Sequence, residues 1–127
     1  MYIGELSKKS GVSIKAIRHY EDIALIKTPA RQGKYRVYDA SFLDVLAMIK
    51  LAKSLGFTLN ELQNIAKAKT DEGFVPMDLL KDEIAKKRQN IKQKMEKMNE
   101  MLSGLTQLEK DVAHHNACLL ESFENRD

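Results

Sequence analysis

The chain has no tryptophan, two prolines and one cysteine in 127 residues. A single cysteine, Cys118, excludes a disulfide within the chain. No apolar run approaches the ~20 residues of a membrane-spanning helix, and the stretch MYIGELSKKSGV lacks the apolar core of a signal peptide. We therefore expect a cytoplasmic protein without a membrane partner.

The sequence also lacks the residue sets of the common catalytic sites. It contains no recognisable nucleophile–base pair, no glycine-rich phosphate-binding loop and no framed pair of carboxylates. Its hydrophobic content of 43% argues against a disordered chain, and its length predicts one domain with an appended element. We expect a binding protein rather than an enzyme.

Charge is distributed unevenly along the chain. Residues 1–70 carry 12 Lys and Arg against 6 Asp and Glu, whereas residues 71–127 carry 9 against 12. The net charge of +3 therefore hides a basic first half and an acidic second half. Such asymmetry indicates two tasks, with a polyanion as the natural partner of the first half.

Two short helices joined by a turn are expected within residues 3–26. Gly11 ends the first helix, and Ser13 can cap the second by accepting a backbone N–H. Apolar residues fall on one face at helical spacing, while Lys15 and Arg18 fall on the other. This is the outline of a helix-turn-helix with a cationic second helix. The alternative is an ordinary surface helix with solvated cations.

The stretch RQGKYRVY, residues 31–38, contains three cations, two tyrosines and no acid. Gly33 accepts a positive φ and can form a tight turn, after which KYRVY alternates its side chains like a strand. Arginine and tyrosine both donate hydrogen bonds to phosphate oxygens. The stretch therefore predicts a β-hairpin wing that contacts a nucleic-acid backbone.

A second helical pair is expected behind the wing. Apolar residues recur at helical spacing from Phe42 to Leu55, and Thr58 with Glu61 forms a capping-box pattern. Lys50 and Lys53 are either additional backbone contacts or solvated surface lysines.

Three stretches, IGELSKKSGVSIKAIRHYEDIALI, GKYRVYD and LGFTLNELQNI, resemble the DNA-binding domain of the MerR (mercury-resistance regulator) family of bacterial transcription regulators. The resemblance covers roughly residues 2–68. It implies a homodimeric winged-helix protein that binds double-stranded promoter DNA and distorts an overlong spacer for RNA polymerase holoenzyme. By position in the motif, the implied base-reading residues are Lys15 and Arg18, and the implied phosphate contacts are Tyr20, Arg31, Tyr35, Arg36 and Tyr38.

The second half predicts a coiled coil. After a polar linker at residues 71–75, no residue except Gly104 opposes a helix over residues 76–112. Apolar residues recur every seven positions, which is the coiled-coil pattern. The first seam position holds Ile84, Ile91, Met98, Leu105 and Val112, and the second holds Arg88, Met95, Leu102 and Glu109. The family resemblance implies an antiparallel homodimer, whereas the heptads leave the orientation open.

The candidate effector residues lie in a short tail, residues 113–127. His114, His115 and Cys118 could supply part of a zinc or copper site, because a helix brings residues four apart together. The alternative is a packed thiol beside two solvated imidazoles. Met95, Met98 and Met101 are better explained as adaptable core residues than as soft-metal ligands.

The tail departs from the metal-sensing branch of the family. That branch places one cysteine at the start of the dimerisation helix and two near its end. Here Val75–Met77 occupy the first place, and only Cys118 is available at the second. We assign no metal; the cofactor is unknown, the fold should require none, and a metal effector is left open. No segment large enough for an organic effector is expected.

Together these patterns predict an all-α dominated fold. A winged helix-turn-helix with a small β-hairpin wing occupies residues 1–70, followed by the linker, the dimerisation helix and the tail. The expected function is a signal-responsive activator that distorts an inverted-repeat promoter. The alternatives are an effector-independent repressor or architectural DNA-binding protein, and a coiled-coil interaction module.

Overall fold

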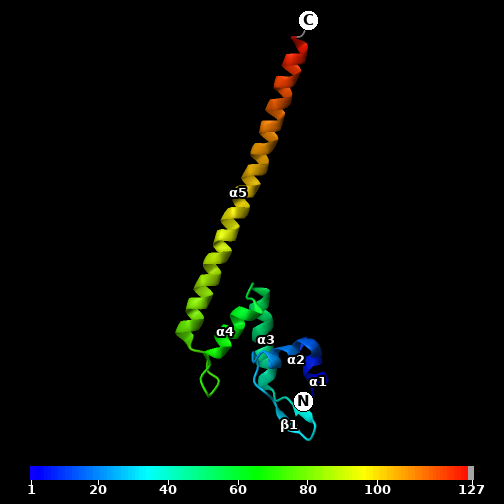
Figure 1. Ribbon diagram of the computed structural model, residues 1–127, viewed down its shortest axis with the longest axis vertical. Helices are drawn as coiled ribbons and strands as arrows, with labels where there is room; N and C mark the ends of the chain where they lie inside the picture. The colour runs from blue at the N-terminus through cyan, green and yellow to red at the C-terminus, as the bar shows by residue number, and fades with distance from the viewer. Residues whose placement is uncertain (126–127) are drawn as a thin grey trace. The chain divides into compact units, whose positions relative to one another are not determined.

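The computed structural model describes residues 1–125 and contains five helices and one two-stranded sheet within that range (Figure 1). The chain divides into two units, residues 1–84 and the chain from Ala85 on. The first unit holds α1 to α4, the sheet and the first residues of α5. The second unit consists of the remainder of α5.

The helix-turn-helix consists of α1 (Ile3–Ser10) and α2 (Ile14–Asp22). Gly11 ends α1 with a φ of 73°, which glycine adopts without the steric penalty of a side chain. The turn is held by Ser7 Oγ, which donates to the carbonyl oxygen of Val12 at 2.7 Å. As expected, the Ser13 side chain caps α2 by accepting from Ala16 N–H at 3.1 Å.

The wing is an antiparallel hairpin of β1 (Ala30–Gln32) and β2 (Tyr35–Val37). Gly33 occupies the turn with a φ of 62°, as a two-residue hairpin loop requires. The register pairs Arg31 directly with Arg36. The strand is shorter than the sequence pattern predicts, because Lys34 lies in the turn and Tyr38 lies beyond the last paired residue.

The second helical pair consists of α3 (Ser41–Ser54) and α4 (Leu59–Lys67). The capping box at the start of α4 is confirmed: the Thr58 side chain accepts from Glu61 N–H, and the Glu61 carboxylate accepts from Thr58 N–H. On α3, Leu55 caps the C-terminal end of the helix and exposes 54% of its surface, so the last apolar residue of the pattern lies outside the core.

The core of the first unit lies where α1, α2 and α3 meet the end of the wing. α1 packs against both α2 and α3. The buried residues of the core come from these three helices, from the end of the wing and from the loop after α2. They are Leu6, Ile17, Tyr20, Leu25, Ile26, Tyr38, Phe42, Leu46 and Ile49. Burial of these side chains supplies the main free energy that holds the first unit together.

Helix α5 (Met77–Glu124) begins one residue after Pro76 and runs without a break to Glu124 (Figure 1). It passes through Gly104 and Val112, so the expected boundary between a dimerisation helix and a separate tail does not correspond to a break in secondary structure. The reason is local, since residues 113–124 contain no glycine or proline. Residues 126–127 of the expected tail lie outside the described residues.

The expected fold class is confirmed by a helical structure with a two-stranded wing and a long C-terminal helix. Among residues 1–125, no helix combines the length and the apolar character that crossing a membrane requires.

Replacing Leu46 with alanine should destabilise the first unit strongly. Leu46 is fully buried in α3, so the shorter side chain leaves a cavity and should lower the free energy of unfolding by about 2–5 kcal/mol. Met48→Ala is the matched control, since Met48 lies on the same helix with 61% of its surface exposed. Urea unfolding followed by tyrosine fluorescence should separate the two variants. Equal losses would show that α3 presents a different face to the core.

Candidate nucleic-acid interface

The exposed face of α2 carries the cations expected of a recognition helix. Ile17 is fully buried, which turns the opposite face of the helix outward. Lys15 and Arg18 lie on that outward face and are exposed to solvent. Their side chains are therefore accessible to a polyanion, as a base-reading helix requires.

The wing presents two arginines at the same level of the hairpin. Arg31 lies directly opposite Arg36, an arrangement of like charges that disfavours strand pairing unless another group compensates. Glu21, near the end of α2, supplies that compensation. Both oxygens of its carboxylate accept from Arg36 Nε at 3.0 Å. The ion pair joins the wing to the recognition helix and uses only Nε of the guanidinium.

A groove of about 180 Å³ lies where α2, the wing and the start of α1 come together. Arg18 of α2 and the wing residues Lys34 and Arg36 bring three cationic side chains to this groove. The full lining is Tyr2, Ile3, Arg18, Lys34, Tyr35, Arg36 and Tyr38. The rings of Tyr2 and Tyr35, both part of this lining, lie 5.7 Å apart between centroids. Convergent guanidinium and ammonium groups of this kind suit an anionic ligand.

Tyr38 belongs to the wall of this groove and to the core at once. Its side chain is fully buried, and its ring meets the edge of Phe42 at a centroid distance of 5.0 Å. Within residues 1–125, its hydroxyl has no hydrogen-bond partner. Burial raises the pKa of the Tyr38 phenol, and the nearby Glu21 carboxylate raises it further, while Arg36 and Arg18 act in the opposite direction. The hydroxyl therefore stays protonated as a potential donor.

Two of the seven expected DNA-contacting residues, Tyr20 and Tyr38, have buried side chains. Tyr20 and Tyr38 expose 5% and 0% of their surface, because both rings fill the core. The Tyr20 hydroxyl accepts a long hydrogen bond from Lys53 Nζ at 3.4 Å. The other five residues lie on the accessible side of α2 and the wing: Lys15, Arg18, Arg31, Tyr35 and Arg36. Contact of any of the seven with phosphate or base stays a prediction.

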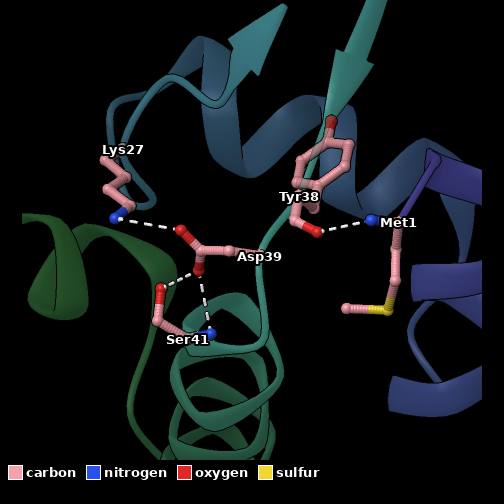
Figure 2. A network of polar contacts seen from close by, with 5 residues as sticks. All are labelled: Met1, Lys27, Tyr38, Asp39 and Ser41. Carbon is pink, nitrogen blue, oxygen red and sulfur yellow. Dashed lines mark hydrogen bonds and ion pairs between the residues drawn. The ribbon is translucent and has the colours of Figure 1, made fainter.

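The end of the wing is anchored by main-chain and carboxylate contacts (Figure 2). The amine of Met1 donates to the carbonyl oxygen of Tyr38, and Tyr38 N–H donates to the carbonyl oxygen of Met1, both at 2.7 Å. Asp39 accepts from Ser41 N–H and Ser41 Oγ and lies 3.9 Å from Lys27 Nζ. The hydrogen bonds from Ser41 lower the pKa of the Asp39 carboxyl, with Lys27 adding to the effect. These contacts fix the direction in which the wing leaves the core.

Sequence reasoning missed Glu21 and Tyr2 as parts of the site. Glu21 is 15 residues from Arg36 in sequence, so no local pattern pairs the two. The two acids that end this cationic helix, Glu21 and Asp22, were the available signal, since a carboxylate near a helix C-terminus is unfavourable without a neighbouring cation. Tyr2 precedes the first helix and offered no periodic signal at all.

The candidate effector residues lie on the second unit. His114 Nε2 and Cys118 Sγ lie 3.6 Å apart, as their four-residue spacing on a helix predicted. The thiol is exposed. Within residues 1–125, however, no three histidine, cysteine or carboxylate side chains gather as a metal-ligand group, so His115 does not complete a site with this pair.

Residues 1–69 match the family described as MerR HTH family regulatory protein, and residues 43–108 match the family described as MerR, DNA binding. Both matches cover more than half of the chain. They overlap on α3 and α4, which join the helix-turn-helix and the wing to α5.

Individual relatives agree with these matches. The mercuric resistance operon regulatory protein of Bacillus cereus is 47% identical over 50% of the chain and 48% of its own length. The chain thus spans about half the length of this curated relative. An HTH-type transcriptional regulator of Synechocystis sp. is 32% identical over 93% of the chain and 92% of its own length. Among solved structures, a lead(II)-bound transcription regulator of Ralstonia metallidurans has a TM-score of 0.70 at 25% identity, over 87% of this chain and 86% of that one.

Replacing Tyr38 with phenylalanine should leave the protein as stable as before or more stable. The buried hydroxyl lacks a partner within residues 1–125, and an unsatisfied buried hydroxyl costs about 1–3 kcal/mol. Because burial raises the phenol pKa, the folded state favours the neutral form, and this stabilisation is lost as the pH rises above the unfolded value of about 10. Urea unfolding at pH 7 and above pH 10 should show a smaller alkaline loss for Tyr38→Phe than for the parent protein.

The control is Tyr35→Phe. Tyr35 exposes 67% of its surface, so its change should stay within about 0.5 kcal/mol at pH 7. A Tyr38→Phe variant that is clearly less stable than the parent at pH 7 would mean that the hydroxyl has a bonding partner after all.

Proposed function

Because the chain belongs to the MerR HTH family of regulatory proteins, we propose that it is a homodimeric transcription regulator. In this proposal it binds an inverted-repeat promoter and activates transcription by distorting the spacer DNA in response to a signal. Its relatives are transcriptional regulators rather than enzymes. The protein would act in the cytoplasm, on a promoter that RNA polymerase holoenzyme also occupies.

The observation that carries the DNA-binding part is the cationic groove between α2 and the wing. Arg18, Lys34 and Arg36 converge there from a recognition helix and a hairpin. A duplex that placed its major groove against α2 would bring its backbone to the wing. Cations on both elements then neutralise phosphates, and the resulting release of counterions makes the affinity depend on salt.

The dimer follows from the character of α5. Apart from Arg88 and Glu109, the side chains of its seam are apolar yet exposed in the single chain, and a second copy is the simplest means of covering them. Two DNA-binding units related by a twofold axis match an inverted repeat. Bending or untwisting of the DNA between the half-sites is the step by which such a dimer changes promoter geometry.

The experiment that tests the function is footprinting on the DNA upstream of the protein's own coding region. Protection of an inverted repeat, together with altered reactivity of the bases between its halves, would support a promoter-distorting dimer. Protection without distortion would favour the repressor or architectural alternative. No sequence-specific protection would favour the coiled-coil interaction module.

The candidate residues for sensing the signal lie near the C-terminal end of α5. His114 and Cys118 supply two potential soft-metal ligands, one thiolate and one imidazole. A structural zinc site uses four ligands, so the described residues of one chain do not fit a closed zinc site. We therefore propose Cys118 as the candidate sensing residue without assigning a metal to it.

Arg36→Ala should weaken binding to every duplex by a similar factor. The side chain is expected to neutralise one phosphate, so its loss should reduce the slope of log affinity against log salt by about one. Fluorescence anisotropy with operator and random duplexes at several salt concentrations measures both quantities. An unchanged affinity and slope would remove Arg36 from the interface.

The variant Glu21→Gln distinguishes a direct contact of Arg36 with DNA from a role of the Glu21–Arg36 ion pair in positioning the wing. The variant removes the carboxylate charge that holds Arg36 Nε while keeping the shape of the side chain. If Arg36 contacts phosphate directly, losing this competing anion should leave DNA affinity equal or higher. A loss as large as that of Arg36→Ala would mean instead that the ion pair acts by holding the wing in place.

Arg18→Ala should reduce the difference in binding affinity between operator DNA and random DNA. A bidentate arginine–guanine contact is worth about 1–3 kcal/mol of discrimination, and the exposed position of Arg18 on α2 suits such a contact. Competition titrations with both duplexes give this difference. Equal losses on the two sequences would place Arg18 among the phosphate contacts.

Cys118→Ser should abolish the transcriptional response to at least one of copper, zinc, an oxidant or an electrophile. Serine keeps the size of the side chain but is a poor ligand for soft metals and is not oxidised like a thiol. His115→Ala is the control, because His115 does not join the His114–Cys118 pair. A promoter-reporter assay with each compound measures the response. A Cys118→Ser protein that responds as the parent does would make the thiol structural.

A further inference from the structure

The apolar seam of α5 extends beyond the region that the sequence pattern assigned to it. Leu119 continues the first seam position seven residues after Val112, and Phe123 continues the second. These side chains are exposed in the single chain, as are those before them: Ile91, Met95, Met98, Leu102, Leu105, Val112, Leu119 and Phe123. An apolar stripe of this length on one helix requires a covering partner.

Two charged residues interrupt the stripe, and they have opposite signs. Arg88 and Glu109 both occupy the second seam position and lie three heptads apart. A dimer must therefore place both side chains at the contact between its helices. Which charges meet there depends on whether the two helices run in the same or opposite directions.

A parallel dimer would juxtapose like charges. Each residue would lie level with its own copy, so Arg88 would face the partner's Arg88, and Glu109 would face the partner's Glu109. Both contacts are repulsive, and the low dielectric of a partly buried seam strengthens the repulsion. An antiparallel dimer centred between residues 98 and 99 would instead bring Arg88 near the partner's Glu109, twice by symmetry.

The remaining charges of α5 favour the same orientation. Apart from Arg88 and Glu109, residues 86–97 contain five cations and one acid, whereas residues 100–111 contain two acids and one cation. An antiparallel pair centred between residues 98 and 99 lays the first segment along the partner's second segment. A parallel pair would lay the strongly basic segment along its own copy. The antiparallel arrangement therefore avoids the like-charge repulsion between two basic segments.

We infer that Arg88 and Glu109 form two symmetry-related ion pairs between copies of this chain and that these pairs fix the orientation and register of the dimer. The inference rests on the proposed homodimer and names the residues that specify it. The antiparallel homodimer itself agrees with what the family resemblance implies, and the inference concerns the two residues that select it.

Two antiparallel registers lie close to the proposed centre, and both allow the contact between Arg88 and the partner's Glu109. Antiparallel packing places a residue of one seam position level with a residue of the other position. The two registers closest to the proposed centre place Arg88 level with the partner's Val112 or with the partner's Leu105. The partner's Glu109 is three or four residues away in either case, roughly 6 Å or less along the axis. Arginine and glutamate side chains can span that offset.

The physical role of these pairs is selection rather than stability. An ion pair that replaces two apolar side chains in a seam generally adds little to the free energy of association, because desolvation offsets much of the attraction. Its value lies in the cost of the wrong arrangement, where like charges meet without compensation. Apolar residues of the seam provide the affinity, and the two charges exclude alternatives.

Charge exchange in the full chain tests the inference. Arg88→Glu and Glu109→Arg each turn two attractive contacts into repulsive ones, and each should raise the dimer dissociation constant by about tenfold or more. The double variant Arg88→Glu/Glu109→Arg restores opposite charges and should return to within about threefold of the parent. Sedimentation equilibrium measures the constants. Lys97→Glu and Glu100→Arg make the same charge changes away from the seam, and each should shift the constant by less than about threefold.

A distance measurement supplies a second and independent readout. Cys118 is the only cysteine and is exposed, so a nitroxide label attaches at one place per chain. In the proposed antiparallel registers, the two labelled positions lie about 55–65 Å apart along the axis at 1.5 Å per residue. In a parallel dimer they would lie side by side, roughly 10–30 Å apart including the label arms. Pulsed electron–electron double resonance between the two nitroxide labels distinguishes these two distance ranges.

The outcomes separate the failure of this inference from the failure of the proposed dimer. A parent protein that stays monomeric at tens of micromolar overturns both. If the parent is a stable dimer but the single charge exchanges leave its dissociation constant unchanged, the ion pairs alone are overturned. The same conclusion follows if the double variant does not regain the parent's dissociation constant. A short distance between the Cys118 labels overturns the antiparallel orientation, whatever the exchange variants show.

Discussion

The burial of the Tyr38 ring is the constraint on which the DNA-facing surface depends. Tyr38 follows the second strand of the wing, and its ring lies in the core against Phe42. Its main chain is bonded in both directions to Met1. Once this residue is fixed, the strand before it must leave the core in one direction, and Arg36 comes to lie beside Glu21 on α2. The wing cations and the recognition helix therefore form one surface because a single aromatic side chain is shared between the groove and the core.

Features determined by near neighbours in sequence could be predicted, and features determined by tertiary packing could not. The caps at Ser13 and Thr58 were recognisable because each cap and its partner lie within a single turn of helix. The burial of the Tyr20 and Tyr38 rings could not be predicted, because tyrosine suits both a core and an interface, and only the packing around it decides. Helix α5 continues past Val112, the last apolar residue of the recognised repeat, because residues 113–124 contain no glycine or proline.

Charged residues in this chain act mainly by arranging other elements. Glu21 joins the wing to α2 at a place where two arginines of the hairpin would otherwise face each other uncompensated. In the proposed dimer, Arg88 and Glu109 would perform the comparable task between two chains. In both cases the free energy gained by the pair itself is small, and the disfavoured arrangement carries the larger penalty. Apolar burial gives the fold its stability, while charge determines which of several apolar contacts form.

In the proposed dimer, the exposed seam of α5 would link the lifetime of the protein to its abundance. Among the described residues of α5, none is buried within a single chain. A helix in that condition gains its protection from association, so mass action governs how much of it is covered at any moment. Chains present below the dissociation constant of the dimer would expose an apolar helix to proteases and to unrelated apolar surfaces. Newly made protein would thus be removed most readily when scarce, and a threshold of synthesis would separate an absent regulator from an effective one.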